Sequence, residues 1–176
     1  MARTSAEWWS ETKTNPEALR DWLFDQFRGE ATAAERIEML RDRFASPGTR
    51  AWRLLTTIAG QEREHAAWVG ELLRARGHRA EVRPAASRYW ADPIAAIRDL
   101  STGCAVGAHA EAMRLERIEV IAKDPGAPDD VRAVFARILP EERFHERAFR
   151  SLATPASLAA TASAHAAGRE ALGLLP

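Results

Sequence analysis

Hydrophobic residues recur every three or four positions along most of the chain's 176 residues. This spacing places apolar side chains on one face of an α-helix. β-branched residues are scattered, and nowhere do they alternate with polar residues over the length of a strand, so the signals of a β-sheet are almost absent. The pattern predicts an all-α fold with five helices, over residues of about 16–45, 47–76, 93–123, 128–152 and 155–172.

Capping residues followed by proline mark most of the expected helix starts. The side chains of Asn, Ser, Asp and Thr accept hydrogen bonds from the free N–H groups of a first turn, and proline suits the first helical position because it lacks an N–H. The sequence holds four such pairs: Asn15-Pro16, Ser46-Pro47, Asp92-Pro93 and Thr154-Pro155. A fifth start follows Pro128, and Arg76-Gly77 has the form of a helix end.

The connections between these helices predict their arrangement. The links before residues 47 and 128 are short, which is typical of antiparallel neighbours, whereas residues 77–92 form a longer link. Two helical hairpins joined by one long crossover between the second and third helices make a four-helix bundle. We expect residues 1–176 to form a single domain, with a bundle core of about 16–152 and an additional C-terminal helix of about 155–172.

Charged side chains interrupt the apolar face of every long helix near its middle. They are Glu30 in the first helix, Glu62 and His65 in the second, Glu111 in the third, and Glu142 and His145 in the fourth. Burying a carboxylate without a partner costs several kcal/mol, so a group of them requires compensating cations. Glu64 and Glu141 lie beside these residues but point in other directions, and we expect both to face solvent.

The two halves of the chain repeat this arrangement. Glu111 lies 81 positions after Glu30, and Glu142 and His145 each lie 80 positions after Glu62 and His65. Glutamate and histidine three residues apart on a helix can reach one point beside its axis. A single Glu-x-x-His arises by chance with roughly even odds, so one alone is weak. Two of them at a common offset, each with a further glutamate, are a strong signal.

Four carboxylates and two imidazoles are a hard ligand set suited to two divalent metal ions. Two such ions would neutralise four carboxylates, which explains how the acids can lie in a core. The alternative is a layer of ion pairs with nearby arginines, which leaves the two histidines unexplained; the candidates are Arg63, Arg114, Arg117 and Arg143. Arg114 lies one turn from Glu111, where it either binds a glutamate or a substrate carboxylate, or extends along the surface.

Three short motifs resemble those of one protein family. They are Phe27-Arg28-Gly29-Glu30, Gln61-Glu62-Arg63-Glu64-His65-Ala66 and Glu141-Glu142-Arg143-Phe144-His145-Glu146. They resemble the ferritin-like di-iron carboxylate superfamily, in particular rubrerythrin-like and bacterioferritin-like proteins, and the resemblance spans about residues 16–152.

The resemblance implies a cofactor of two iron ions, or of manganese and iron together. It implies that Glu62 and Glu142 bridge the metals, and that the terminal ligands are Glu30, Glu111, His65 and His145. The implied activity is an oxidase or oxygenase that activates O₂ or peroxide and acts on a small molecule. The single cysteine, Cys104, cannot build a rubredoxin-type iron site, so electrons would come from an external donor.

Two departures keep alternatives open. Rubrerythrins carry an additional glutamate in the third helix, and the neighbouring positions here are Ala108 and Arg114, which weakens the expectation of a rubrerythrin-like peroxidase. Bacterioferritins share the six ligands, so a ferroxidase or iron-storage protein is an alternative, as is a metal-free structural bundle. Small residues near Glu111, among them Gly103 and Gly107, either leave room for a substrate or let helices pack closely.

Composition excludes several other classes. Lys plus Arg and Asp plus Glu number 25 each, so no net field favours nucleic acid or an anionic membrane. The N-terminal residues lack the apolar run of a signal peptide, and no stretch of about eighteen strongly apolar residues is present. We expect a cytoplasmic protein, and the abundance of arginine and alanine suggests a bacterial one. A homodimer is compatible with the sequence.

Overall fold

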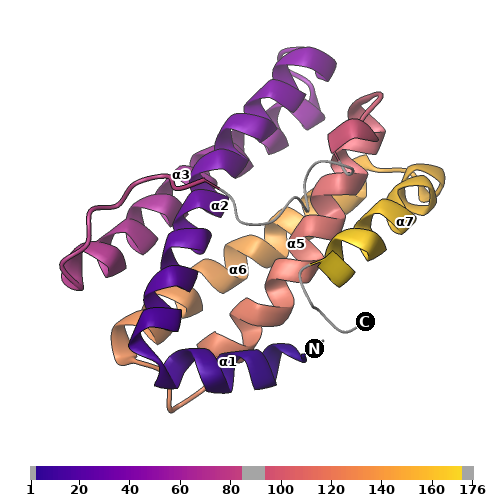
Figure 1. The fold of residues 1–176 in the computed structure, drawn as a ribbon. Helices are drawn as coiled ribbons and strands as arrows, with labels where there is room; N and C mark the ends of the chain where they lie inside the picture. Colours follow the sequence, from indigo (N-terminus) through magenta and orange to yellow (C-terminus); the bar gives the residue numbers. More distant parts are fainter. Residues whose placement is uncertain (1–2, 85–93, 172–176) are drawn as a thin grey trace.

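The computed structural model describes residues 3–84 and 94–171 of the chain, and the helix labels below are those of Figure 1. The expected all-α class is confirmed, since the described residues form long helices and no β-sheet. The helices are α1 (Ser5–Thr14), α2 (Pro16–Phe44), α3 (Arg50–Ala75), α5 (Leu100–Lys123), α6 (Asp129–Leu152) and α7 (Pro155–Ala171). In the described part of the chain, no helix is both long and apolar enough to cross a membrane.

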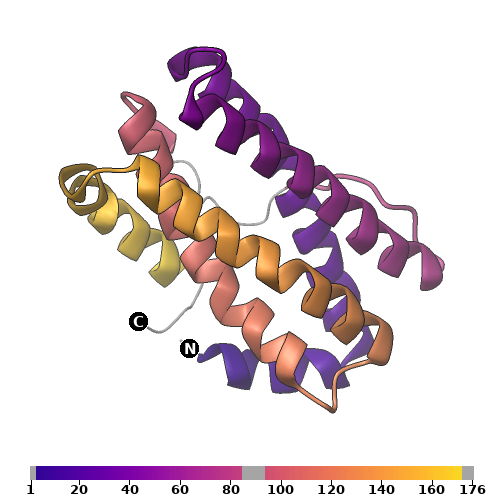
Figure 2. The same cartoon turned by 180° about the vertical axis from the view of Figure 1, so that it is seen from behind.

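The expected bundle of two hairpins is also confirmed. Helices α2 and α3 pack side by side, as do α5 and α6, and the hairpins meet mainly where α3 contacts α6 (Figures 1 and 2). The long crossover runs between the end of α3 and the start of α5. Helix α7 packs along the outside of α5, as the additional C-terminal helix that the sequence predicts.

Two helices begin later than the proline pairs predict. Helix α3 begins at Arg50 and not at residue 47, because Thr49 takes the capping position and accepts a hydrogen bond from the N–H of Trp52. Helix α5 begins at Leu100, where Asp99 accepts a hydrogen bond from the N–H of Thr102. The pair Asp92-Pro93, which was expected to open this helix, lies outside the described residues. At residue 47 the side-chain cap of Thr49 therefore overrides proline as the start signal.

Helix α1 was not predicted. Thr4 and Glu7 form a reciprocal capping box at its start, in which each side chain accepts a hydrogen bond from the backbone N–H of the other residue. The Trp9 ring is 2% exposed, and its Nε1–H donates to Asp124 Oδ2 at 2.8 Å. Lys13 Nζ donates to the same oxygen at 2.7 Å. These contacts fix α1 across the start of α2 and the end of α5 (Figure 1).

The core consists of two apolar clusters with a polar layer between them. One cluster contains Leu23 before Glu30, Ile118 after Glu111 and Phe135 before Glu142. The other contains Ile58 before Glu62 and Phe149 after His145. Because neighbouring helices run in opposite directions, the interruptions of their apolar faces coincide at one level of the bundle. The mid-helix charges predicted from the sequence thus form one layer.

The small residues of α5 serve close helix packing. A Cβ added at Gly103 would lie 2.1 Å from Leu40 Cδ1, and one added at Gly107 would lie 2.9 Å from Phe149 Cδ1. The space beside these glycines is therefore already filled by side chains from α2 and α6. Of the two explanations that the sequence left open, close packing is the one that the contacts support.

Candidate metal centre

Six candidate ligands from four helices meet in the polar layer. Helix α2 supplies Glu30, α3 supplies Glu62 and His65, α5 supplies Glu111, and α6 supplies Glu142 and His145. Five of the six are 0% exposed, and Glu111 is 4% exposed. No position named from the sequence is turned away from the others, so the register read from the apolar faces places every one of them inside the bundle.

Each histidine faces the glutamate of the opposite motif. His145 Nδ1 lies 3.2 Å from Glu62 Oε1, and His65 Nδ1 lies 3.4 Å from Glu142 Oε1. Candidate ligand atoms of these four residues all lie within 4.8 Å of one another. This separation is short enough for a metal ion to be held between α3 and α6.

Glu30 and Glu111 lie on the side of this group formed by α2 and α5. Glu30 Oε2 is 3.8 Å from His65 Nδ1, and Gln26 Nε2 donates a hydrogen bond to the other carboxylate oxygen of Glu30. Glu111 Oε2 is 3.6 Å from the guanidinium of Arg114. Each of the two chain halves thus adds one further glutamate to its Glu-x-x-His motif.

A second pair of side chains orients the imidazoles from outside. His65 Nε2 lies 2.8 Å from Glu141 Oε2, and His145 Nε2 lies 3.0 Å from Gln61 Oε1. An Nε2–H that donates to these oxygens leaves Nδ1 directed at the cluster, which is how metal-binding histidines are commonly oriented. Glu141 is therefore directed at His65 and faces solvent only in part, with its side chain 29% exposed, whereas Glu64 is exposed as expected.

Gln61 and Glu141 were missed as functional positions although the sequence carries a signal for them. Each immediately precedes the glutamate of one motif, and the two are 80 positions apart, the same offset as the motifs themselves. Neighbouring positions on a helix point about 100° apart, which suggested that Glu141 would leave the core. In the structure each of these side chains reaches sideways to the histidine of the facing helix.

Arg114 points into the cluster. Its guanidinium contacts Glu30 Oε2 most closely and lies 3.6 Å from Glu62 Oε2 and 3.9 Å from Glu142 Oε1. Its side chain is only 17% exposed. Of the two positions that the sequence left open for Arg114, the contacts support the one beside the glutamates, because the concentrated negative charge draws the long side chain inward.

The other three arginines considered for an ion-pair layer lie elsewhere. Arg63 pairs with Glu38, and Arg143 pairs with Glu119 at 2.7 Å. Arg117 stacks over the Trp8 ring, 4.4 Å from its centroid. His109 lies outside the cluster and stacks on His165 with centroids 4.7 Å apart. Among the described residues a single arginine thus faces four carboxylates, too few cations for an ion-pair layer.

The cluster shifts the pKa values of its members in opposite directions. Burial raises the pKa of both Glu62 and Glu111 well above the ordinary value. Burial also acts on Glu30, but the Arg114 charge and the neighbouring His65 outweigh it and lower that pKa to about 2. Burial disfavours the His65 cation, yet Glu142 and Glu30 outweigh this effect and raise its pKa to about 11. Without metal, protons and Arg114 together balance the carboxylates.

The polar atoms of the layer fit a metal centre. Buried oxygen or nitrogen atoms without a hydrogen-bond partner occur in all six candidate ligands, and they include Nδ1 of both histidines and both carboxylate oxygens of Glu62 and Glu142. A buried polar atom without a partner is costly and uncommon. Metal coordination would satisfy these atoms, because carboxylate oxygens and neutral imidazole nitrogens are ligands for divalent iron and manganese.

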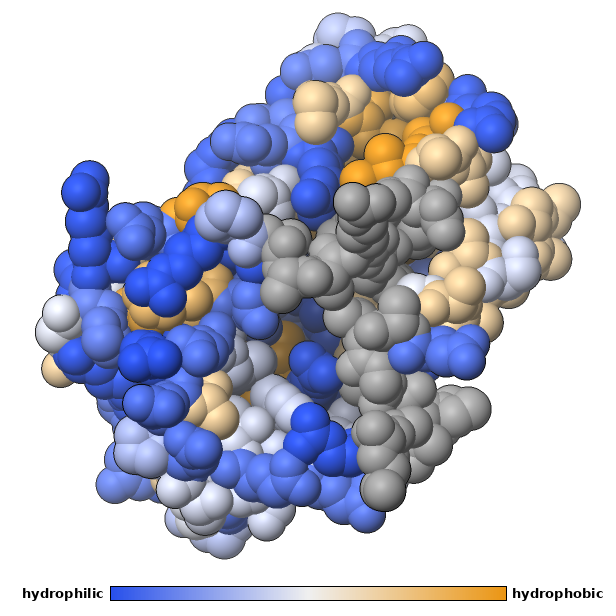
Figure 3. Space-filling model, in the orientation of Figure 1, coloured by the Kyte–Doolittle hydropathy of each residue, from blue (hydrophilic) through white to orange (hydrophobic). Residues whose placement is uncertain are grey.

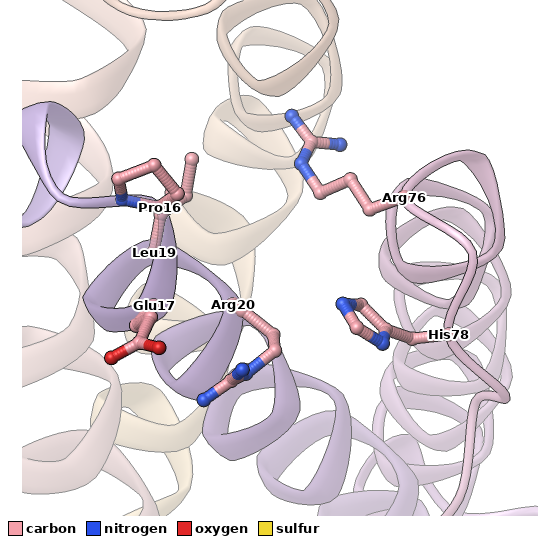
Figure 4. A pocket seen from close by; sticks show the side chains of 6 residues that line it. All are labelled: Pro16, Glu17, Leu19, Arg20, Arg76 and His78. Carbon is pink, nitrogen blue, oxygen red and sulfur yellow. The ribbon is translucent and has the colours of Figure 1, made fainter.

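The metal centre is distinct from a surface cleft of about 310 Å³ between the start of α2 and the end of α3 (Figure 4). This cleft is lined by Pro16, Glu17, Leu19, Arg20, Arg76 and His78. None of these residues belongs to the polar layer, and Arg76 there already donates to both carboxylate oxygens of Asp130, at 2.8 and 3.1 Å.

Comparisons with known proteins agree with this site. A solved structure described as Protein 43 with aldehyde deformylating oxygenase activity, from Synechococcus, superposes with a TM-score of 0.78 at 25% sequence identity. The similarity covers 97% of this chain and 87% of that one. No curated protein sequence matches the chain. Residues 21–153 match the rubrerythrin family, a span that contains most of α2, all of α3, α5 and α6, and all six candidate ligands, and the chain therefore belongs to the rubrerythrin family, within the ferritin-like di-iron superfamily.

Proposed function

We propose that this chain is a non-haem di-iron oxidoreductase that uses O₂ or peroxide to oxidise a small molecule. The observation that carries the proposal is the pair of Glu-x-x-His motifs facing each other across α3 and α6, with both Nδ1 atoms directed at the opposing glutamates at 3.2 and 3.4 Å. A purely structural bundle has no need for four glutamates and two histidines in its core.

Six residues would hold the metals: Glu30, Glu62, His65, Glu111, Glu142 and His145. The metals are two iron ions in our proposal, with manganese and iron together as the alternative, since both accept these ligands. Bound iron would supply the electrons that reduce O₂ or peroxide.

The chain's own residues prepare the site for this chemistry. Gln61 and Glu141 fix the imidazole rings, so that His65 and His145 present Nδ1 to the metals without a search for orientation. The apolar clusters above and below the layer, which include Phe135 and Phe149, exclude water from it. A dry site strengthens the electrostatic interactions within it and limits side reactions of oxidising species.

Electrons for a complete catalytic cycle would come from an external donor. Cys104 is the only cysteine and is buried, and burial raises the pKa of its thiol to about 12. A single cysteine cannot hold an iron–sulfur or rubredoxin-type centre. We therefore expect a separate reductant to dock near the bundle.

An oxygenase is favoured over a peroxidase or a storage protein. The Synechococcus protein of similar structure is described as having aldehyde deformylating oxygenase activity, which supports a reaction of O₂ with an organic molecule and makes aldehydes the first substrates to test. Arg114 places a positive charge beside Glu111, where a further carboxylate would be expected in a rubrerythrin-like peroxidase. A guanidinium has no lone pair to offer a metal ion, so this position does not supply a seventh ligand.

The test is anaerobic loading with Fe(II), followed by metal analysis and by O₂ uptake with and without aldehydes of different chain length. We expect two irons in each chain, no tight iron in Glu62→Ala, and O₂ uptake that one class of substrate accelerates. Faster turnover with peroxide than with O₂ would indicate a peroxidase. Iron far beyond two per chain, in a large assembly on size-exclusion chromatography, would indicate storage. Failure of the parent chain to bind iron would refute the proposed function.

A further inference from the structure

Arg114 holds the position where the four glutamates converge. Its guanidinium nitrogens lie within 4 Å of Glu30, Glu62, Glu111 and Glu142, so one side chain contacts a carboxylate from each long helix. These are the same four carboxylates that would bind metal. The Nδ1 atoms of the histidines, in contrast, are directed at glutamates and have no cation as partner.

From this juxtaposition we propose that Arg114 is an exchangeable counter-cation, which neutralises the glutamates in the metal-free chain and is displaced from them when divalent metals bind. The inference rests on the proposed di-metal site. It assigns to Arg114 a role in metal loading, as a positioning residue for the four glutamates.

The distances indicate that the guanidinium and the metal ions compete for the same carboxylate oxygens. A carboxylate oxygen binds a divalent metal at about 2 Å, and the oxygens of Glu62, Glu111 and Glu142 that face Arg114 lie only 3.6 to 3.9 Å from its nitrogens. Metals among these oxygens would therefore lie close to the guanidinium. Like charges at such distances repel strongly in a buried site, where little water screens them.

Charge leads to the same conclusion. The four glutamates carry four negative charges when ionised, and two divalent metals supply four positive ones. A guanidinium that stayed in the layer would leave one positive charge in excess in a buried site, which is unfavourable. With the metals absent, the guanidinium instead offsets part of the negative charge and helps to hold the four helices together.

The chain offers a path along which the guanidinium can withdraw. A Cβ added at Gly29 on α2 would lie 4.0 Å from Arg114 Nη2, so the glycine leaves space beside the guanidinium. Asp25, one turn before Gly29, and Arg117, one turn after Arg114, both line a cleft of about 450 Å³. Figure 3 shows this face as mostly hydrophilic, with a hollow between α2 and α5. Asp25 and Asp21 give the cleft negative charge that would attract the displaced cation, although they also pair with Arg28 and Arg20, each at 2.8 Å.

The experiment compares the parent chain with Arg114→Gln and Arg114→Lys, and with Arg41→Gln as the matched control. The Arg41 side chain on α2 is 14% exposed, close to the 17% of Arg114, and it stacks on Trp52 away from the cluster. Each protein is stripped of metal, its thermal unfolding is recorded, and its binding of Co(II) is titrated by calorimetry and by absorption.

We expect opposite effects on the two measurements. Arg114→Gln should lower the unfolding temperature of the metal-free chain and raise Co(II) affinity at least about tenfold, because the competing cation is gone. Arg114→Lys should lie between this variant and the parent chain. Arg41→Gln should leave Co(II) affinity within about twofold of the parent.

Unchanged or weaker Co(II) binding in Arg114→Gln, with binding by the parent intact, would overturn the inference and leave the di-metal site standing. No binding by the parent would instead refute the proposed function. If metal-free Arg114→Gln does not fold, crystal structures of the parent chain with and without Co(II) test whether the guanidinium is displaced. A guanidinium that keeps its contacts with Glu30 and Glu142 while two metal ions are bound would contradict the displacement.

Discussion

Glu141 Oε2 lies 2.8 Å from Nε2 of His65, on the side of the ring opposite the candidate metal centre. The equivalent contact in the other half of the bundle joins His145 to the neutral amide of Gln61 at 3.0 Å. The six candidate ligands thus follow a two-fold pattern, whereas their outer partners, Gln61 and Glu141, differ between the two halves. A carboxylate raises the basicity of the imidazole that it holds more than an amide does, so the two histidines are unequal ligands.

The first prediction concerns this unequal support. Glu141→Gln should weaken Co(II) binding about 10- to 100-fold, the usual effect of losing an outer partner of a metal-binding histidine. Glu64→Gln is the control, because Glu64 is an exposed glutamate in the other motif. Gln61→Glu should change affinity in the opposite direction from Glu141→Gln. Equal affinities for the parent, Glu141→Gln and Glu64→Gln in calorimetry would show that the contact does not support a metal ligand.

The sequence predicted the candidate ligands better than it predicted their surroundings. Glu62 and His65 could be found because helical periodicity and a repeated offset restrict the same positions independently. No comparable restriction applied to Arg114, whose long side chain reaches either the core or the surface from one backbone position. Helix α1 escaped detection because it is only 10 residues long and mostly polar, although Thr4 and Glu7 carry a capping signal.

The second prediction is a pH dependence of metal binding. In the metal-free chain burial raises the pKa values of Glu62 and Glu111, and nearby carboxylates raise that of His65 to about 11. His65 therefore holds a proton at neutral pH, and the shifts of Glu62 and Glu111 favour their protonated forms, so metal binding must displace protons. Affinity should fall as the pH falls, by about tenfold per pH unit for each proton released. Calorimetry in buffers of different ionisation enthalpy counts those protons, and a pH-independent affinity would contradict the assignment.

The third prediction separates close packing from an open pocket on α5. Gly103→Ala places a methyl group 2.1 Å from Leu40 Cδ1, so the leucine must move, and we expect a loss of about 1–3 kcal/mol in the free energy of unfolding. Gly60→Ala is the matched control, because a Cβ there meets nothing within 4 Å and should stabilise α3 by up to about 1 kcal/mol. Urea unfolding measures both. An undiminished stability in Gly103→Ala would mean that free space exists beside this residue.

The fourth prediction tests the docking of α1. Trp9→Ala removes a buried ring and its hydrogen bond to Asp124, and should lower the free energy of unfolding by about 3–5 kcal/mol. Metal stoichiometry should not change, because Trp9 lies outside the polar layer. Trp52→Ala serves for comparison, since Trp52 is half-buried and stacks on Arg41, whose guanidinium lies 4.7 Å from the ring centroid. A smaller loss in Trp9→Ala than in Trp52→Ala would contradict this packing.

The two apolar clusters lie on opposite sides of the glutamate layer, and each draws residues from all four bundle helices. The polar layer therefore joins the two clusters, and whether it stabilises the bundle depends on whether metal is bound. Filled with metal, it cross-links four helices at mid-height and makes the two clusters one cooperative unit. Held together by one arginine and by protonated carboxyls, it couples the clusters weakly. Metal binding would then determine whether the bundle unfolds as one unit or whether each apolar cluster unfolds separately. Metals would enter by local opening of the polar layer.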